Sequence, residues 1–324
     1  MFTEYGKSGF PRLKRLVPLM ISAPAGILLL VAAATVSGIG HRWVDLLAQF
    51  AAPALGVAIV LTAATLLLRQ FRPAAVHGVA ALALLIAVWP QWAPPSGSAR
   101  PDTPVVRLYS ANLWARNSDV EAITRSIAAA DADIVILIEL GDAPAARLDQ
   151  VLAGYPHRVM TPRVDRRGGA ARSVIASRFP LTAVADVADG LQDVVAVART
   201  PLGPLNVIGV HLTRPWPFQY QWGQISQVQA LAQVRSGLTG PVIAAGDFNS
   251  VSTGRIGRQV QTEVALSPAP GWPGTWPSFA PSIVGLTIDQ VYRSPDLVFV
   301  SRRLGRPTGS DHRPVITEFT LAAD

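Results

Sequence analysis

Three long apolar stretches in the first 92 residues restrict the possible folds more than any other feature of the chain. They run over about residues 16–39, 46–68 and 74–92. Each approaches the roughly 20 residues that a helix needs to cross the hydrocarbon core of a bilayer. The charged residues gather between the stretches, in the segments GHRWVD and RQFRP. This pattern predicts three transmembrane helices.

Two other interpretations of this region are open. The basic segment KSGFPRLKR precedes the first stretch as it would in a signal peptide, but the apolar run is too long for one and two more follow. The helices could also form the core of a soluble domain, where three uncharged runs of this length seldom occur together. A transporter is disfavoured, because the stretches hold almost no polar side chains that could line a path.

The basic residues beside the stretches predict an orientation in the membrane. Six Lys and Arg residues lie on the side of the N-terminus and three on the opposite side. Because positively charged loops tend to stay in the cytoplasm, we expect the N-terminus inside. Three crossings then place the rest of the chain outside the cytoplasm. The sequence thus predicts a multi-pass membrane protein whose partner is the lipid bilayer, and no protein partner is evident.

Composition separates the second part of the chain from the first. The chain of 324 residues has a formal net charge of +7, yet residues 1–100 hold eight basic and only two acidic side chains. The remainder is therefore close to neutral, and a basic nucleic-acid-binding face is not required there. The absence of cysteine excludes disulfides, zinc–thiolate sites and cysteine nucleophiles.

The hydrophobic pattern changes after residue 104. Residues 93–104 are rich in Pro and Ser and are expected to link the membrane region, 1–92, to a domain over 105–324. Within that domain, short apolar runs such as VVRLYSANL and DIVILIEL alternate with helical stretches. Runs this short and numerous predict a β-rich sandwich with helices on its outer faces.

Polar side chains recur at or just beyond the ends of the apolar runs. They are Asn112, Glu139, His211, Asp247, Asn249, Asp289, Asp311 and His312. Strand ends that converge on one edge of a sheet can build a site from residues far apart in sequence. Singly, Asn112 could cap a turn and His211 could be a packed polar side chain. Glu139 and Asp289 need more explanation, because a carboxylate in an apolar strand is costly unless it is paired or bound to a metal.

Several segments, taken in order, resemble the motifs of the endonuclease/exonuclease/phosphatase superfamily. They are SANLW, DIVILIEL, SVIASRFPL, GVHLTRP, AAGDFNS, TIDQVY and GSDHRPV, and the resemblance covers about residues 105–320. It implies an α+β fold, a four-layer α/β/β/α sandwich like that of deoxyribonuclease I, with its site at one edge of the sheets. It also implies a metal-dependent phosphoric ester hydrolase.

The resemblance implies a metal site built around Glu139. This residue would be the principal ligand of Mg²⁺, with Mn²⁺ as the alternative, and Asn112 and Asp311 would complete or support the shell. Mg²⁺ prefers hard oxygen ligands and keeps several waters, so one or two carboxylates and the substrate phosphate suffice.

The resemblance also implies roles in the reaction. His312 would be the general base that takes a proton from the attacking water, and Asp289 would hydrogen-bond to it. Asp247 and Asn249 would orient the phosphate and the leaving group. His211 would donate a hydrogen bond or a proton to a phosphate oxygen.

The chain departs from the family pattern at the partner of His211. Nuclease members carry a carboxylate that orients the equivalent histidine, but the strand SVIASRF contains no acid. Asp165, in the preceding loop, is the nearest candidate.

The substrate is the least constrained part of the prediction. The candidate contacts are Arg172, Arg214, Trp216 and Trp276. Tryptophans that stack on bases would suit a nuclease, but the near-neutral domain lacks the positive field that such enzymes use. A membrane tether favours a lipid phosphodiester instead. The alternatives are a membrane-tethered nuclease and a catalytically silent membrane adaptor with the same fold.

Overall fold

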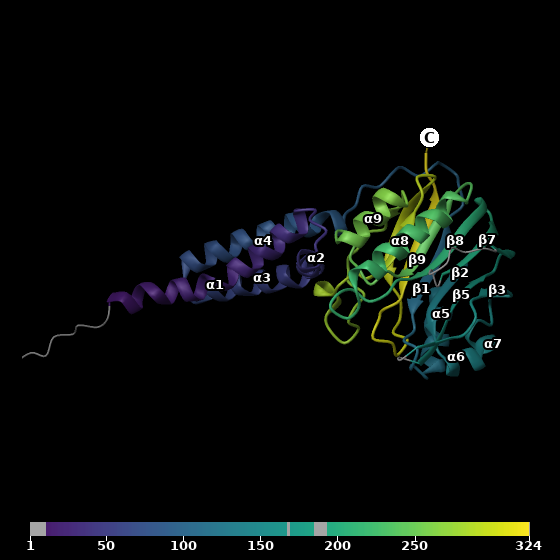
Figure 1. Ribbon diagram of the computed structural model, residues 1–324, viewed down its shortest axis with the longest axis horizontal. Helices are drawn as coiled ribbons and strands as arrows, with labels where there is room; N and C mark the ends of the chain where they lie inside the picture. The colour runs from purple at the N-terminus through teal and green to yellow at the C-terminus, as the bar shows by residue number, and fades with distance from the viewer. Residues whose placement is uncertain (1–10, 167–168, 185–192, 324) are drawn as a thin grey trace, which may run out of the picture.

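The computed structural model describes the backbone of residues 11–166, 169–184 and 193–323, and the side chains of residues 20–164, 171–184 and 193–323. It consists of an elongated helical region and a β-sandwich domain at one end of it (Figure 1). The helical region contains α1 (Pro11–Val36), α2 (Arg42–Gln49), α3 (Ala51–Leu67) and α4 (Phe71–Trp92). The long helices α1, α3 and α4 lie side by side, and the turn between α3 and α4 is at the end far from the domain.

Small side chains fill the interior of the helical region, and large apolar side chains cover its outside. The buried cluster is mostly alanine: Ala25, Leu28, Val31, Ala32, Ala51, Ala52, Ala54, Leu55, Ala58, Ala80, Leu84, Ala87 and Val88. Large apolar residues that are more than half exposed include Ile27, Leu30, Val60, Leu67, Leu82 and Ile86. A bundle in water has the reverse arrangement, whereas small residues at helix contacts are typical of bilayers.

One helix in the described part of the chain, α4, is long and apolar enough to cross a membrane. Helices α2 and α3 would count as a second span if taken together, but they are bent by 56° at the break between them. Residues 20–36 of α1 form a shorter apolar helix. The three predicted spans are therefore not shown. The stretch expected to be continuous over 46–68 is divided because part of it, in α2, packs on the second domain.

Two β-sheets form the second domain. The first has the strand order β12-β13-β1-β2-β5-β3, with β4 paired to β5. Its strands are β1 (Val106–Asn112), β2 (Ile134–Leu140), β3 (His157–Met160), β4 (Val164–Arg166), β5 (Gly169–Ser177), β12 (Leu297–Leu304) and β13 (Val315–Leu321). The second sheet has the order β10-β11-β9-β8-β7-β6. Its strands are β6 (Leu181–Ala183), β7 (Val194–Thr200), β8 (Gly203–His211), β9 (Val242–Asp247), β10 (Ser267–Pro268) and β11 (Asp289–Arg293).

The sheets pack face to face, and helices cover their outer faces. The helices of this domain are α5 (Val120–Ala130), α6 (Asp142–Ala146), α7 (Leu148–Val151), α8 (Gln221–Ser236), α9 (Arg255–Glu263) and the short 3-10 helix η1 (Ser282–Val284). Apolar side chains of both sheets, such as Ile136 and Val207, form the central core. Helices α5 and α7 pack on the first sheet, and α8 and α9 on the second. The predicted arrangement of two sheets between two layers of helices is confirmed.

Candidate active site

The register of the strands brings the predicted polar residues to one edge of the sandwich. His211, at the end of β8, pairs with Asp247, at the end of the parallel strand β9. Asp289, at the start of the antiparallel strand β11, pairs with Asp247 on its other side. Asn112 ends β1 in the first sheet, and its Nδ2 donates to Asp247 Oδ2 at 3.0 Å. This hydrogen bond joins the two sheets at the site.

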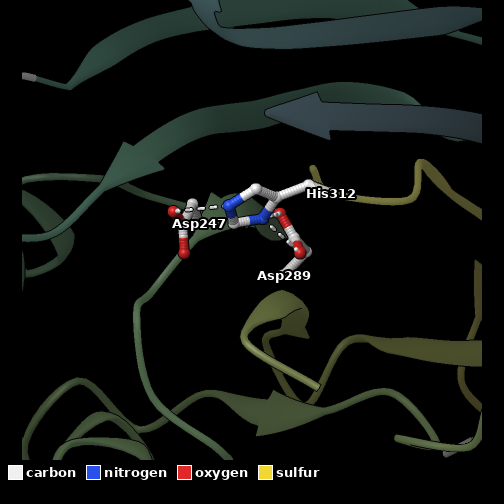
Figure 2. Close-up of side chains that lie close together, drawn as sticks. All are labelled: Asp247, Asp289 and His312. Carbon is white, nitrogen blue, oxygen red and sulfur yellow. Dashed lines mark hydrogen bonds and ion pairs between the residues drawn. The ribbon is translucent and has the colours of Figure 1, made fainter. Parts of the chain in front are cut away.

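His312 lies between two buried carboxylates, as Figure 2 shows. Its Nδ1 is 2.9 and 3.1 Å from the two oxygens of Asp289, and its Nε2 is 4.0 Å from Asp247 Oδ2. Asp289 is held in turn by Thr275, whose Oγ1 accepts from its backbone N–H at 3.2 Å. A proton on Nδ1 leaves Nε2 of the neutral imidazole as the acceptor. Burial opposes a charged imidazole, but the charges of Asp289 and Asp247 outweigh it and raise the pKa of His312 to about 10.

Asp247 is fixed by the loop that follows it. Asn249 donates to Asp247 Oδ1 from its backbone N–H at 2.8 Å and to Oδ2 from its side chain at 3.0 Å. Asn249 also donates to the carbonyl of Leu212 at 3.0 Å, and its φ of +49° is one that Asn tolerates better than most residues. Gly246 and Asp247 of the GDFN segment therefore end β9, and Asn249 in the loop that follows holds the side chain of Asp247 in the site.

Glu139 turns out of its strand toward His211. The register between β2 and β5 shifts after Leu137, and Glu139 has a φ of +53°. Its Oε1 is 3.3 Å from His211 Nε2, and its Oε2 accepts from the N–H of Ala115 at 3.1 Å. Burial opposes ionisation, but the hydrogen bond and charge of His211 outweigh it and lower the pKa of Glu139 to about 2. An outlying backbone conformation at such a carboxylate is typical of functional sites.

The donor set of this site fits a hard divalent cation. Asp247, Asp289 and His312 offer ligand atoms that lie within 4.8 Å of one another. Both carboxylates are 2% exposed, and the one imidazole does not balance both. Burial and the charge of Asp289 raise the pKa of Asp247 to about 6 despite the opposing charge of His312. A cation would stabilise this buried negative charge, and carboxylate oxygens are the ligands that Mg²⁺ prefers.

The residues predicted to bind the metal lie around this group. Asn112 uses its Nδ2 for Asp247, and its Oδ1 accepts from the N–H of Trp114 at 2.9 Å. Asp311 is exposed and accepts from the indole Nε1 of Trp276 at 3.3 Å. The charge of His312 contributes to the lowered pKa of Glu139, and that of Asp311 to the raised pKa of His312. Glu139 and Asp311 thus share one electrostatic environment with His312.

Asp193 is a residue of this region that the sequence analysis missed. It precedes β7, the strand beside β8, and its Oδ1 accepts from the backbone N–H of His211 at 3.3 Å. Its other oxygen has no hydrogen-bond partner among the described residues. An acid directly before the apolar run VVAVART was the available signal. The side chain of Asp165, the candidate named instead, lies outside the described residues.

Asp193→Asn is expected to make stability less dependent on pH. Burial raises the pKa of Asp193 to about 8, against the opposing hydrogen bond from His211. Between about pH 4 and pH 8 the folded state therefore binds more protons here than the unfolded state, so stability falls as pH rises. The Asn variant lacks this slope, and its Tm relative to wild type should increase from pH 5 to pH 8. A Tm difference that is constant over this range would contradict the prediction.

The four residues predicted to contact the substrate lie in different surroundings. Arg172 forms an ion pair with Asp142 at 3.0 Å, and Arg214 is exposed in the loop after His211. Trp276 lies beside the site through its contact with Asp311. Trp216 instead packs edge-on against Trp43 of α2, with ring centroids 4.0 Å apart. Trp216 is half-buried and lies at the contact with the helical region, and its role in substrate binding stays a prediction.

A family model described as "Endonuclease/Exonuclease/phosphatase family" matches residues 109–312. The chain belongs to this family. The match begins inside β1 and ends at His312, so the helical region lies outside it. Members of the family are typically hydrolases that act on phosphoesters, and they usually use a divalent metal. No curated protein matches the chain.

Several solved structures share the fold at low sequence identity. The structure of an endonuclease/exonuclease/phosphatase from Beutenbergia cavernae is 21% identical over 68% of this chain and 72% of its own, with a TM-score of 0.54. One from Bacteroides vulgatus is 16% identical over 67% and 99%, with a TM-score of 0.52. Beta toxin from Staphylococcus aureus is 16% identical over 65% and 99%, with a TM-score of 0.51. These likenesses establish the sandwich fold of the second domain.

Proposed function

We propose that the chain is a membrane-anchored, divalent-metal-dependent phosphoric ester hydrolase that acts on a lipid phosphodiester. The observation that carries the proposal is the His312–Asp289 pair, whose second ring nitrogen, Nε2, faces Asp247 at the edge of the sandwich where Glu139 also lies. This is the arrangement that a general base needs: an oriented imidazole with one nitrogen available to water.

Each residue of the site has a role in this proposal. Nε2 of His312 takes the proton of the attacking water, and Asp289 fixes the ring and stabilises the imidazolium that forms. Glu139 would hold Mg²⁺ or Mn²⁺ with support from Asn112 and Asp311, and the bound ion would offset negative charge on the phosphoryl oxygens. The same ion would counteract the carboxylates that raise the pKa of His312, so that the neutral base is present near pH 7.

The remaining polar residues would act on the phosphate itself. Asp247 and Asn249 would orient the phosphate and the leaving group. His211, held between Glu139 and Asp193, would donate to a phosphoryl oxygen through its ring. No covalent enzyme intermediate is needed.

The packing of the helical region supports a membrane anchor. Its alanine-rich interior and its exposed Ile, Leu and Val residues suit a lipid environment better than water. We propose that α1, α3 and α4 cross the membrane. The excess of Lys and Arg on the side of the N-terminus supports an orientation with that end in the cytoplasm and the sandwich domain outside it.

The position of the loop over residues 271–285 supports a lipid substrate. This loop carries Trp276 at the site and reaches α3, where a Cβ on Gly56 would lie 2.5 Å from the side chain of Val284. Phe279 and Ile283 in the same loop are 87% and 59% exposed. We infer from these exposed apolar side chains and the contact with α3 that this edge of the domain faces the bilayer. The domain's near-neutral charge argues against the nuclease alternative.

A substrate panel with and without EDTA tests the proposal. We expect release of a phosphorylated head group from phospholipid or sphingolipid vesicles, lost with EDTA and restored by Mg²⁺ or Mn²⁺. Cleavage of an oligonucleotide but not of vesicles would favour the nuclease. Absence of all hydrolysis, together with absence of metal binding, would favour the adaptor.

Replacing Phe279 and Ile283 together by Ala is expected to raise the apparent KM for vesicle substrate about 100-fold or more, since burying each large apolar side chain is worth about 1.5–3 kcal/mol and about 1.4 kcal/mol is a factor of ten. Hydrolysis of a soluble short-chain analogue should be unchanged, because these residues do not form the site. Val300→Ala, an exposed apolar residue on β12, is the matched control. An equal loss of hydrolysis of the vesicle substrate and of the soluble analogue would contradict a membrane contact by these two residues.

A further inference from the structure

Helix α2 contacts the active-site loop through two buried polar side chains, Gln49 and Asp45. They are 6% and 5% exposed and lie one turn apart on the helix. Gln49 Oε1 accepts from the N–H of Val251 at 2.8 Å, and its Nε2 donates to Ser250 Oγ at 3.2 Å. The same Nε2 donates to Asp45 Oδ1, also at 3.2 Å. Helix α2 therefore meets the domain through two buried, hydrogen-bonded polar side chains, in addition to the ring of Trp43.

Asp45 caps a helix of the sandwich domain. Its Oδ1 accepts from the N–H of Arg255, the first residue of α9, at 2.8 Å. The residue at the N-cap itself, Gly254, has no side chain to do this. A Cβ on Gly254 would lie 2.5 Å from Gln49 Nε2 and 3.2 Å from Asp45 Oδ1, so glycine permits the close approach. The negative charge of Asp45 also lies at the favourable end of the α9 dipole.

These contacts hold both ends of the segment that follows the catalytic strand β9. Asn249 in this segment fixes both oxygens of Asp247, and Ser250 and Val251 come directly after it. From the other side, Gln224 of α8 donates to the carbonyl of Asn249 at 3.3 Å. The loop that aims Asp247 and Asn249 is thus clamped between α8 of its own domain and α2 of the helical region.

We propose that Gln49 and Asp45 are positioning residues for the active site, which makes the helical region part of the catalytic scaffold. They act through the backbone of residues 250–255, which sets where Asn249 and Asp247 present their side chains. The inference rests on the proposed function for its kinetic consequence, while the position of the loop is measurable by itself.

Other contacts allow the helical region to stay docked when Gln49 is changed. Trp43 packs on Trp216, and the carbonyl of Gln91 accepts from the N–H of Gly271 at 2.8 Å. The Trp43–Trp216 contact does not involve residues 248–255, whereas the side chain of Gln91 also accepts from Thr253 Oγ1 at 3.3 Å and keeps its contact when Gln49 is changed. Loss of Gln49 should therefore disturb the loop without separating the two regions, which allows a positioning role to be distinguished from a role in docking.

The test compares Gln49→Ala with Gln70→Ala in the full-length chain, reconstituted in phosphatidylcholine vesicles with the lipid substrate. Gln70 precedes α4 at the far turn of the helical region, so its loss removes the same side chain away from the domain. In Gln49→Ala we expect faster hydrogen exchange confined to residues 248–255 and a kcat lowered about 10-fold with an unchanged KM, since small misplacements of catalytic groups are costly. Gln70→Ala should change neither.

A double-mutant cycle and a conservative variant complete the test. Gln49→Ala and Ser250→Ala should be non-additive in kcat, because both remove the same contact. Asp45→Asn keeps an acceptor for Arg255 and should retain most of the exchange protection that Asp45→Ala loses. Unchanged exchange at 248–255 in Gln49→Ala, or faster exchange throughout the domain, would overturn the proposal. If the wild-type chain hydrolyses no phosphoester, the proposed function fails, while the exchange data still decide whether Gln49 positions the loop.

Discussion

His312→Gln is expected to lower kcat for phosphoester hydrolysis by about 10³-fold, within the range that a positioned general base contributes. Gln cannot accept a proton from water, but its amide can donate to Asp289 in place of Nδ1. The variant therefore removes the base and keeps the buried carboxylate partnered. His312→Ala would leave Asp289, which is 2% exposed, without this partner, and such a loss could unfold the protein.

The measurement is kcat for vesicle substrate at saturating Mg²⁺, together with Tm. His157→Gln, on the remote strand β3, is the matched control and should retain wild-type activity. A His312→Gln variant that keeps its fold and a tenth or more of the wild-type kcat would show that another group takes the proton.

The polar residues of the site were predictable because each one interrupts or ends an apolar run. A carboxylate such as Glu139 or Asp289 is costly inside a strand, so its presence there demands a partner. The sequence could not show which residue is the partner of each buried side chain. The contact of Glu139 with His211 depends on the shifted register between β2 and β5, and the hydrogen bond of Asp193 depends on the pairing of β7 with β8. Both arise from the three-dimensional arrangement of strands distant in sequence.

In the helical region, the sequence predicted the long helices but not their contacts with the second domain. Apolar runs predict helices well, and α1, α3 and α4 lie where the hydropathy pattern puts them. The pattern could not reveal that α2 is a separate helix, because Asp45 and Gln49 are ordinary polar residues at the edge of an apolar run. Only their burial against Val251 and Arg255 identifies them as an interface. The contact between Trp216 and Trp43 was equally invisible in the sequence, because it joins residues distant along the chain.

Glu139→Gln is expected to weaken Mg²⁺ and Mn²⁺ binding by about 10²-fold and to lower hydrolysis by a similar or larger factor, because the metal contributes several kcal/mol of charge stabilisation. Gln has nearly the same shape, and its Oε1 can still accept from the N–H of Ala115, so the fold should persist. The substitution removes the negative charge that attracts the cation. Isothermal titration of the full-length chain with Mn²⁺ measures the change directly, and Glu121→Gln on α5 is the matched control. Equal Mn²⁺ binding by wild type and Glu139→Gln would place the metal elsewhere, and no binding by either would favour the adaptor.

Metal concentration separates the two active-site variants. If Glu139 acts by holding the cation, a large excess of Mn²⁺ should restore part of the hydrolysis by Glu139→Gln, because mass action refills a weakened site. The same excess should not restore His312→Gln, since occupancy does not supply a proton acceptor. If hydrolysis is restored in both variants, His312 contributes mainly to metal binding. The ligand atoms of Asp247, Asp289 and His312 lie within 4.8 Å of one another, so this alternative has a structural basis. If excess Mn²⁺ restores hydrolysis only in Glu139→Gln, then Glu139 holds the metal and His312 acts as the base.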